Sequence, residues 1–288
     1  MAQAEIGWES KFVLLLVLPM VAVEAVWQAR DWAAASAPAA IWTISLSALL
    51  GLVTWKLRAA TPWAAVAGAV ITASLMFSTL APPYNPLQTA LSPVLAVSVL
   101  AFAATRAGRA QKQRLGTAER PEGRSAAQVT ANLGVAAILS SPFARSSLAI
   151  GRWPTPSAFA LVTAGLAALA EAAADTVSSE IGQVFAGRPR MITTLRRVQP
   201  GVDGAVSLAG TMAGLVAAAL VAACGALALR GGVIMFTASG AGGVFGFLFD
   251  SLLGATLEQR GWLNNDAVNF LSTAAAAALA LAVSALTY

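Results

Sequence analysis

The chain has 288 residues, of which 58% are hydrophobic and only 11% are charged, and it carries a formal net charge of +5. Soluble domains have about 25% charged residues, so this composition excludes an ordinary soluble protein and predicts an integral membrane protein. The sequence contains no histidine and one cysteine, Cys224, which excludes Ser-His-Asp nucleophiles, most zinc sites and an intrachain disulfide, and leaves metal chemistry based on oxygen ligands.

Nine apolar runs follow one another along the chain, several of them close to the roughly 20 residues that cross a bilayer. They cover residues 12–29, 39–55, 63–80, 88–105, 126–143, 157–183, 205–228, 232–258 and 267–286. The segment before the first run is short and of mixed charge, and no small-residue cleavage site follows the run, so we expect it to remain as a membrane helix. The sequence predicts an all-α, polytopic bundle of about nine transmembrane helices, organised as one integral membrane domain over residues 1–288.

Basic residues are unevenly divided between the two sides of this predicted bundle. If the first helix starts inside the cell, fourteen of the eighteen lysines and arginines lie on the inner side, and the exceptions are Arg30, Arg145, Arg152 and Arg230. Positive residues favour cytoplasmic loops, so the N-terminus is expected in the cytoplasm. We expect the protein in the inner or plasma membrane of a prokaryote, with its active site facing the cytoplasm.

Two long cytoplasmic connections are predicted, at about residues 106–125 and 184–204. The first is basic, and it can set the topology or attract anionic lipid headgroups. The second combines turn-forming glycine and proline with phosphate-binding residue types: Arg188, Arg190, Thr193, Thr194, Arg196 and Arg197. Such a loop can fold around phosphate oxygens.

Three acids, Glu171, Asp175 and Glu180, interrupt the sixth apolar run. An ionisable residue at bilayer depth costs about 2.5–3.5 kcal/mol on insertion scales. Glu171 and Asp175 are four residues apart and therefore share one helical face, which Ser179 extends. These acids indicate a site, although a single acid that only bonds to a neighbouring helix is the alternative.

A second acidic position lies at a matching depth in the eighth run. Asp250 precedes Arg260 by ten residues, and Asp175 precedes Arg188 by about a dozen, in two helices that run in the same direction. We expect both aspartates in the cytoplasmic half of the bundle. Polar residues at the cytoplasmic starts of three other runs are expected to join them: Gln128, Asn132, Asp203, Ser207, Asn264, Asn265, Asp266 and Asn269. Capping of the last helix is the alternative role for Asn264, Asn265 and Asp266.

Carboxylates and arginines at one membrane site suit a diphosphate or triphosphate held through Mg²⁺. This ion is usually coordinated by one or two carboxylates, phosphate oxygens and waters. Asp175 is the first expected metal ligand, followed by Glu171 and Asp250, with Glu180 as a ligand or a supporting residue. Arg190 is expected in the catalytic set with the first three acids. Phosphoryl transfer depends mainly on positioning and charge neutralisation, so the lack of histidine is no obstacle.

Glycines four residues apart occur in the seventh and eighth runs, as Gly210 with Gly214 and Gly242 with Gly246. Such pairs typically allow close helix packing. No P-loop sequence surrounds any of them, so a nucleotide would have to bind in another way.

Several uncommon motifs occur in a fixed order, and together they resemble the integral membrane family catalogued as domain of unknown function 92. The motifs span residues 103–112, 123–132, 174–182, 189–194, 201–207, 249–256 and 265–270, and the resemblance covers about residues 40–288. That family includes the chloroplast phytyl-phosphate kinase of tocopherol synthesis. The resemblance implies a membrane-embedded polyprenyl- or phytyl-phosphate kinase that moves the γ-phosphate of CTP, or of another nucleoside triphosphate, to an isoprenoid monophosphate with Mg²⁺.

Within these motifs, a set of residues is expected at the nucleotide and phosphate site, in addition to the arginines and threonines of residues 188–197. The set is Lys112, Arg124, Asn132, Ser179, Gly201, Asp203, Gly204, Ser207, Asn265 and Asn269. Two alternatives stay open: cytidylyl transfer to a lipid phosphate, and an ion- or proton-coupled transporter that uses the intramembrane acids. We expect the lipid bilayer as a partner and no nucleic acid.

Overall fold

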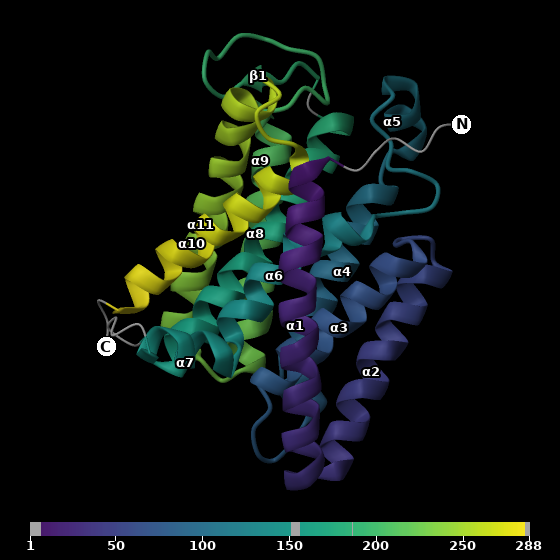
Figure 1. Cartoon of the computed structure of the whole chain (residues 1–288). Helices are drawn as coiled ribbons and strands as arrows, with labels where there is room; N and C mark the ends of the chain where they lie inside the picture. The colour runs from purple at the N-terminus through teal and green to yellow at the C-terminus, as the bar shows by residue number, and fades with distance from the viewer. Residues whose placement is uncertain (1–6, 151–155, 186, 286–288) are drawn as a thin grey trace.

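The computed structural model describes residues 7–150, 156–185 and 187–285, and these form the predicted all-α membrane bundle (Figure 1). Each predicted apolar run overlaps one long helix. The long helices are α1 (Trp8–Ala35), α2 (Ala37–Lys56), α3 (Pro62–Ser78), α4 (Leu91–Arg106), α6 (Ala126–Ser140), α8 (Ala158–Phe185), α9 (Leu208–Ala228), α10 (Gly232–Leu253) and α11 (Asn265–Ala285). Arg152, used in the topology argument, lies outside the described residues.

Six of these helices are long and apolar enough to cross a membrane, or up to eight spans if two bent helix pairs each count as one. The bent pairs join α4 to α5 (Arg109–Leu115) and α6 to α7 (Pro142–Ile150), each with a bend of 64°. Helix α3 is apolar but has only 17 residues. The polytopic bundle is therefore established, and nine crossings stay a prediction.

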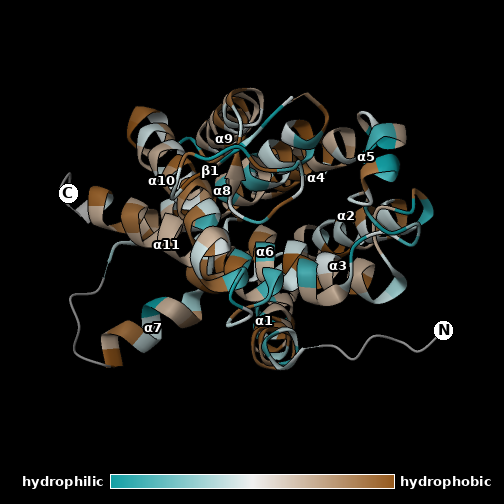
Figure 2. Ribbon diagram, turned by 90° about the horizontal axis from the view of Figure 1, so that it is seen from above, coloured by the Kyte–Doolittle hydropathy of each residue, from teal (hydrophilic) through white to brown (hydrophobic). Residues whose placement is uncertain are grey.

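Helix α8 forms the centre of the bundle. It packs against α4, α6, α9, α10 and α11, which surround it when the molecule is seen from the loop end (Figure 2). Its most apolar window is 78% buried, more than that of any other candidate span. The acids predicted in the sixth apolar run thus lie on the most enclosed helix of the described bundle.

Both predicted glycine pairs bring helices into close contact with α8 or its neighbours. A Cβ atom added at Gly210 would lie 2.6 Å from the carbonyl oxygen of Ser178, and one at Gly214 would lie 3.0 Å from that of Ala174. These distances are too short for a methyl group, so only glycine lets α9 pack so closely on α8. The predicted packing role of this pair is confirmed.

The second pair works in the same way on α10. A Cβ atom at Gly242 would lie 2.5 Å from the carbonyl oxygen of Ala276 on α11, and one at Gly246 would lie 2.5 Å from Cγ of Glu171 on α8. Helices α8, α10 and α11 are therefore held together at the depth of the buried acid, and this pair's packing role is confirmed as well.

The two predicted connections, residues 106–125 and 184–204, lie at one end of the bundle and contain more structure than the sequence predicts. The first includes helix α5, and the second forms a short antiparallel hairpin of β1 (Arg190–Met191) and β2 (Ala205–Val206). Hydrophilic residues gather at this end around α5 and its neighbouring connections (Figure 2). We refer to it as the loop end.

Three short elements are absent from the predicted set: the 3₁₀-turn η1 (Pro86–Gln88), helix α7, and the π-helical turn η2 (Gly254–Glu258) that continues α10. The fifth apolar run extends to residue 143, but α6 ends at Ser140 because Pro142 lacks the N–H that would continue the helix and instead begins α7.

Candidate functional site

Three acidic side chains from two helices meet toward the loop end. Glu171 and Asp175 lie one turn apart on α8, and Asp250 lies on the neighbouring helix α10. The carboxyl groups of Asp175 and Asp250 lie close enough to interact electrostatically, and Glu171 interacts electrostatically with both. The α11 residue Ser272 donates a 3.1 Å hydrogen bond from Oγ to Oδ2 of Asp250. Glu171, Asp175 and Asp250 form what we call the acidic cluster, and the two aspartates meet as their matching depths predict.

Glu171 is the member of this cluster whose buried carboxyl oxygens have no hydrogen-bond partner among the described residues. The residue is 1% exposed, and the unpartnered oxygens are both Oε1 and Oε2. A buried carboxylate without a partner is strongly unfavourable, so it must either hold a proton or face a cation. The cluster therefore either holds a proton or provides a site for a cation.

The predicted Mg²⁺ is compatible with this arrangement. In the part of the chain that the structure describes, no group of three or more acidic, histidine or cysteine side chains is close enough to enclose a metal ion. Mg²⁺ requires no such cage, since it usually takes one or two carboxylates and completes its shell with substrate phosphate oxygens and waters. Asp175 and Asp250 can supply the two carboxylates, and the unpartnered oxygens of Glu171 lie beside them.

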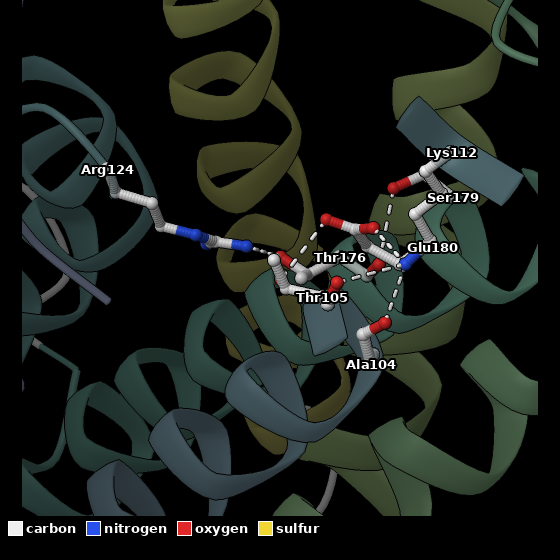
Figure 3. Close-up of polar contacts among 7 residues, drawn as sticks. All are labelled: Ala104, Thr105, Lys112, Arg124, Thr176, Ser179 and Glu180. Atoms are coloured by element: carbon white, nitrogen blue, oxygen red, sulfur yellow. Dashed lines mark hydrogen bonds and ion pairs between the residues drawn. The ribbon is translucent and has the colours of Figure 1, made fainter. Parts of the chain in front are cut away.

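Arg124 is the basic residue that faces the acidic cluster. Its Nη2 donates a 3.4 Å hydrogen bond to Oγ1 of Thr176 on α8 (Figure 3). Its guanidinium also interacts electrostatically with Asp175. The backbone of Arg124 is fixed on both sides, because its N–H donates to Ala59 and its carbonyl accepts from Thr61, each at 3.0 Å. The structure thus gives this predicted phosphate-binding residue a defined position beside the acids.

Lys112 and Glu180 form a buried ion pair. Nζ of Lys112 lies 2.5 Å from Oε2 of Glu180 and also donates to the carbonyl oxygens of Ala104 and Thr105 (Figure 3). The Thr105 hydroxyl donates to the other Glu180 oxygen at 3.1 Å. Lys112 is fully buried. In this structure the pair joins α5 to α4 and α8, and the predicted roles of the two residues at the metal and phosphate site stay predictions.

The arginines of the second connection do not reach the acidic cluster by any hydrogen bond among the described residues. Nη1 of Arg190 donates to the carbonyl oxygen of Leu195 at 2.9 Å, within the same loop. The other members of the predicted phosphate-binding set here are exposed: Arg188, Thr193, Thr194, Arg196 and Arg197. Their role in phosphate binding stays a prediction.

Two glycines of this connection, Gly201 and Gly204, pack closely against neighbouring segments. Gly201 and Gly204 both have positive φ angles, +87° and +74°. A Cβ atom at Gly204 would lie 2.4 Å from the backbone nitrogen of Ala255 in η2, and the carbonyl oxygen of Asp203 accepts a 2.8 Å hydrogen bond from Gln259. The hairpin is therefore seated on the end of α10, close to Asp250.

Other predicted site residues support helix ends or turns. Ser207 Oγ accepts from the Gly210 N–H and caps α9, and Ser179 donates to the carbonyl oxygen of Thr176. Asn132 is buried and donates to the carbonyl oxygen of Gln128 one turn earlier.

For α11 the capping residue is Asn264, whose Oδ1 accepts from the Ala267 N–H at 3.0 Å. Asp266 instead accepts a hydrogen bond from Ser10 on α1. Neither Asn265 nor Asp266 supplies this cap, and Asn269 lies buried within the first turns of α11.

A groove that the sequence did not single out opens beside Arg124. It lies between α2, α3, α4 and α6, reaches Ala172 on α8, and carries arginines at its loop end: Arg58, Arg106, Arg109, Arg120 and Arg124. The sequence interpretation assigned most of these arginines only to topology. In the sequence, only the clustering of basic residues around the first connection pointed to a role for these arginines in binding.

Comparisons with known proteins agree with the membrane architecture. The family model described as "Integral membrane protein DUF92" matches residues 45–277. "Uncharacterized membrane protein MJ0933" of Methanocaldococcus jannaschii is 43% identical over 108 residues, which cover 38% of this chain and 45% of that protein. "Uncharacterized membrane protein sll0875" of Synechocystis sp. is 32% identical over 196 residues, 67% of this chain and 72% of the relative.

A plant relative is also similar. "Protein VTE6, chloroplastic" of Arabidopsis thaliana is 30% identical over 186 residues, which cover 62% of this chain and 54% of the plant protein. The match thus spans about half the length of the archaeal and the plant relative. No solved structure matches the chain.

Proposed function

Because the chain belongs to the integral membrane family DUF92, we propose that it is an isoprenoid-phosphate kinase acting at the cytoplasmic face of a membrane. The reaction would transfer the γ-phosphoryl group of CTP, or of another nucleoside triphosphate, to an isoprenoid monophosphate. The motif resemblance to a family with a phytyl-phosphate kinase supports this reaction class. The observation that carries the proposal is the acidic cluster beside Arg124, at the end of an apolar bundle.

The bond changes in this reaction need little covalent help from the protein. An oxygen of the isoprenoid monophosphate attacks the γ-phosphorus, a new P–O bond forms, and the bond between that phosphorus and the β–γ bridging oxygen breaks. The nucleoside diphosphate leaves with the electron pair. Because both reactants are already anionic, the main task is to neutralise their repulsion and hold them in line.

The residues of the site suit that task. Asp175 and Asp250 would hold Mg²⁺, with Glu171 as a third oxygen donor beside them. When bound, the metal supplies neutralisation of the phosphate charge. Arg124, fixed by backbone hydrogen bonds and aimed at α8, would neutralise a phosphate oxygen from the opposite side.

The deciding experiment uses the purified protein in lipid nanodiscs with γ-labelled CTP, Mg²⁺ and geranylgeranyl or phytyl monophosphate. We expect label in the isoprenoid diphosphate and release of CDP. Asp175→Asn and Asp250→Asn should each lower the rate at least about 100-fold, since each removes a charge that stabilises the transition state. Asp31→Asn, an exposed acid at the end of α1, is the matched control and should leave the rate unchanged.

Other products would point to the other functions. Release of pyrophosphate with a CDP-linked lipid would establish cytidylyl transfer. Absence of any nucleotide reaction, together with a change in ion flux in Asp175→Asn, would overturn the kinase proposal and favour a transporter.

A further inference from the structure

The groove between α2, α3, α4 and α6 changes character along its length. Near the loop end it is surrounded by the five arginines and one acid, Glu119. Deeper in the bundle the lining is mostly apolar and includes Leu50, Val94, Val97 and Leu133. The polar side chains at this depth, Thr72, Ser98 and Asn132, each donate to a backbone carbonyl oxygen one turn earlier in their own helix. Val94 precedes Arg106 by twelve residues on α4, so the apolar part extends roughly 18 Å from the arginines at 1.5 Å per residue.

The arginines around the groove are arranged for an anion. Arg106 is held in place because its Nη2 donates to the carbonyl oxygen of Leu57 at 2.8 Å and its guanidinium lies 4.6 Å from the ring centroid of Phe102. Glu119 forms no ion pair with any of the arginines among the described residues. Five guanidinium groups beside one carboxylate leave a strong positive excess, which favours a phosphate group.

The inner wall of the groove adjoins the proposed reaction centre, although none of the three acids of the cluster lines it. Ala172, the residue that follows Glu171, lines it, and so does Arg124, whose guanidinium interacts with Asp175. A phosphate bound by Arg124 in the groove would therefore lie beside the acidic cluster, with its hydrocarbon chain directed into the bilayer half of the bundle.

We propose that this groove binds the acceptor as a single-chain isoprenoid monophosphate, and that Gly68 leaves the space for its chain. The role of the bound lipid as phosphate acceptor rests on the proposed function. Binding of the lipid in the groove does not depend on that proposal. Gly68 lines the groove on α3, and a Cβ atom added there would meet only Cγ1 of Val129, at 3.7 Å. A larger side chain at this position can thus enter the groove without displacing a neighbouring helix backbone.

Gly68→Leu is the test variant, and Gly240→Leu is its matched control. Gly240 is also a partly exposed glycine within an apolar helix, and its added Cβ would likewise meet a single atom at 3.7 Å, Cβ of Ala222 on α9. Gly240 does not line the groove. The two variants therefore add the same volume at similar cost, one inside the groove and one outside it.

The measurement is binding of tritiated geranylgeranyl monophosphate to the protein in nanodiscs without nucleotide. We expect Gly68→Leu to weaken binding at least tenfold and Gly240→Leu to leave it unchanged. Arg109→Gln combined with Arg120→Gln should also weaken it. Unlabelled geranylgeranyl monophosphate should compete, whereas geranylgeraniol, which lacks the phosphate, and inorganic phosphate, which lacks the chain, should compete at least tenfold less well. Equal competition by two-chain phosphatidic acid would overturn the proposal in favour of a general lipid groove.

The two proposals fail in different ways. If phosphoryl transfer occurs and Gly68→Leu matches Gly240→Leu in both binding and the KM for the acceptor, the groove is not the acceptor site and the kinase proposal stands. If Gly68→Leu abolishes binding but no phosphoryl transfer is seen, the groove proposal stands and the kinase proposal fails.

Discussion

The buried pair of Lys112 and Glu180 shows how a single contact can fix a polar connection to an apolar bundle. Lys112 lies on the short helix α5, which has only seven residues and is too short to be stable by itself. Its ammonium group is satisfied by Glu180 of α8 and by two carbonyl oxygens at the end of α4. The contact holds α5 against the end of the bundle, next to the arginine-lined groove.

Removing one partner of this pair should destabilise the protein strongly. Glu180→Ala leaves the Lys112 charge buried without a carboxylate, which typically costs about 3–5 kcal/mol. The free energy of unfolding in mixed micelles, followed by tryptophan fluorescence, measures this loss. The double variant Lys112→Met with Glu180→Leu removes both charges and should recover most of it.

Glu122→Ala, which changes an exposed acid in the same connection, is the control and should change stability by less than about 0.5 kcal/mol. If Glu180→Ala behaved like this control but lost Mg²⁺-dependent activity, the ion pair would be secondary and Glu180 would be a metal ligand after all.

At the scale of helices, the acidic cluster depends on how closely α8, α10 and α11 approach one another. Gly246 lies on α10 one turn before Asp250, directly against the side chain of Glu171. A π-helical turn follows the same helix and seats the β1–β2 hairpin on it. The packing of α10 on α8 therefore fixes the position of Asp250 and also that of the β1–β2 hairpin.

Gly246→Ala should push α10 away from α8. The added methyl group would lie 2.5 Å from Cγ of Glu171 and 2.7 Å from Cβ of Ala276, so at least one helix must move. We expect a loss of about 1–3 kcal/mol in unfolding free energy. Phosphoryl transfer should decrease as well, because Asp250 moves with the helix. At Gly240 on the same helix, an added Cβ would meet only Cβ of Ala222, at an ordinary contact distance of 3.7 Å, so Gly240→Ala should change stability by no more than about 1 kcal/mol and should keep activity. Equal effects of the two variants would contradict this packing role.

The sequence predicts the long elements and one key contact well, for physical reasons. Hydropathy runs locate each long helix, and small-residue spacing predicts the closeness of α9 and α10 to their neighbours. Depth counting places Asp175 near Asp250 because both helices rise the same distance per residue. Depth along a helix does not determine how α11 is rotated about its axis or how the chain runs into α6. The contacts of Ser272 and Arg124 with the acids therefore could not be predicted. Helix α5 and the hairpin depend on tertiary contacts such as Lys112 with Glu180, which leave no local pattern.

At the scale of the whole molecule, the polar chemistry lies toward one end. Helix α5 and the β1–β2 hairpin lie at the loop end, whereas α7 lies at the other end (Figure 1). The acidic cluster and the arginines of the groove lie toward the loop end as well. A site for an amphiphile requires this asymmetry, since the phosphate must stay near water while the chain stays in the bilayer. The distribution of arginines predicts that the loop end faces the cytoplasm.

Cysteine accessibility can test that orientation, because Cys224 is the chain's single cysteine and can be replaced by alanine. In this background, Arg114→Cys and Thr194→Cys place exposed thiols in the two connections at the loop end, and Leu87→Cys places one at the opposite end. A membrane-impermeant maleimide added to intact cells should label only the thiol at position 87. The thiols at positions 114 and 194 should react only after the membrane is opened, and the cysteine-free protein should not react at all. The reverse pattern would place the acidic cluster and the groove on the outer face. A CTP-dependent kinase would then have no supply of its nucleotide, so this labelling bears directly on the proposed reaction.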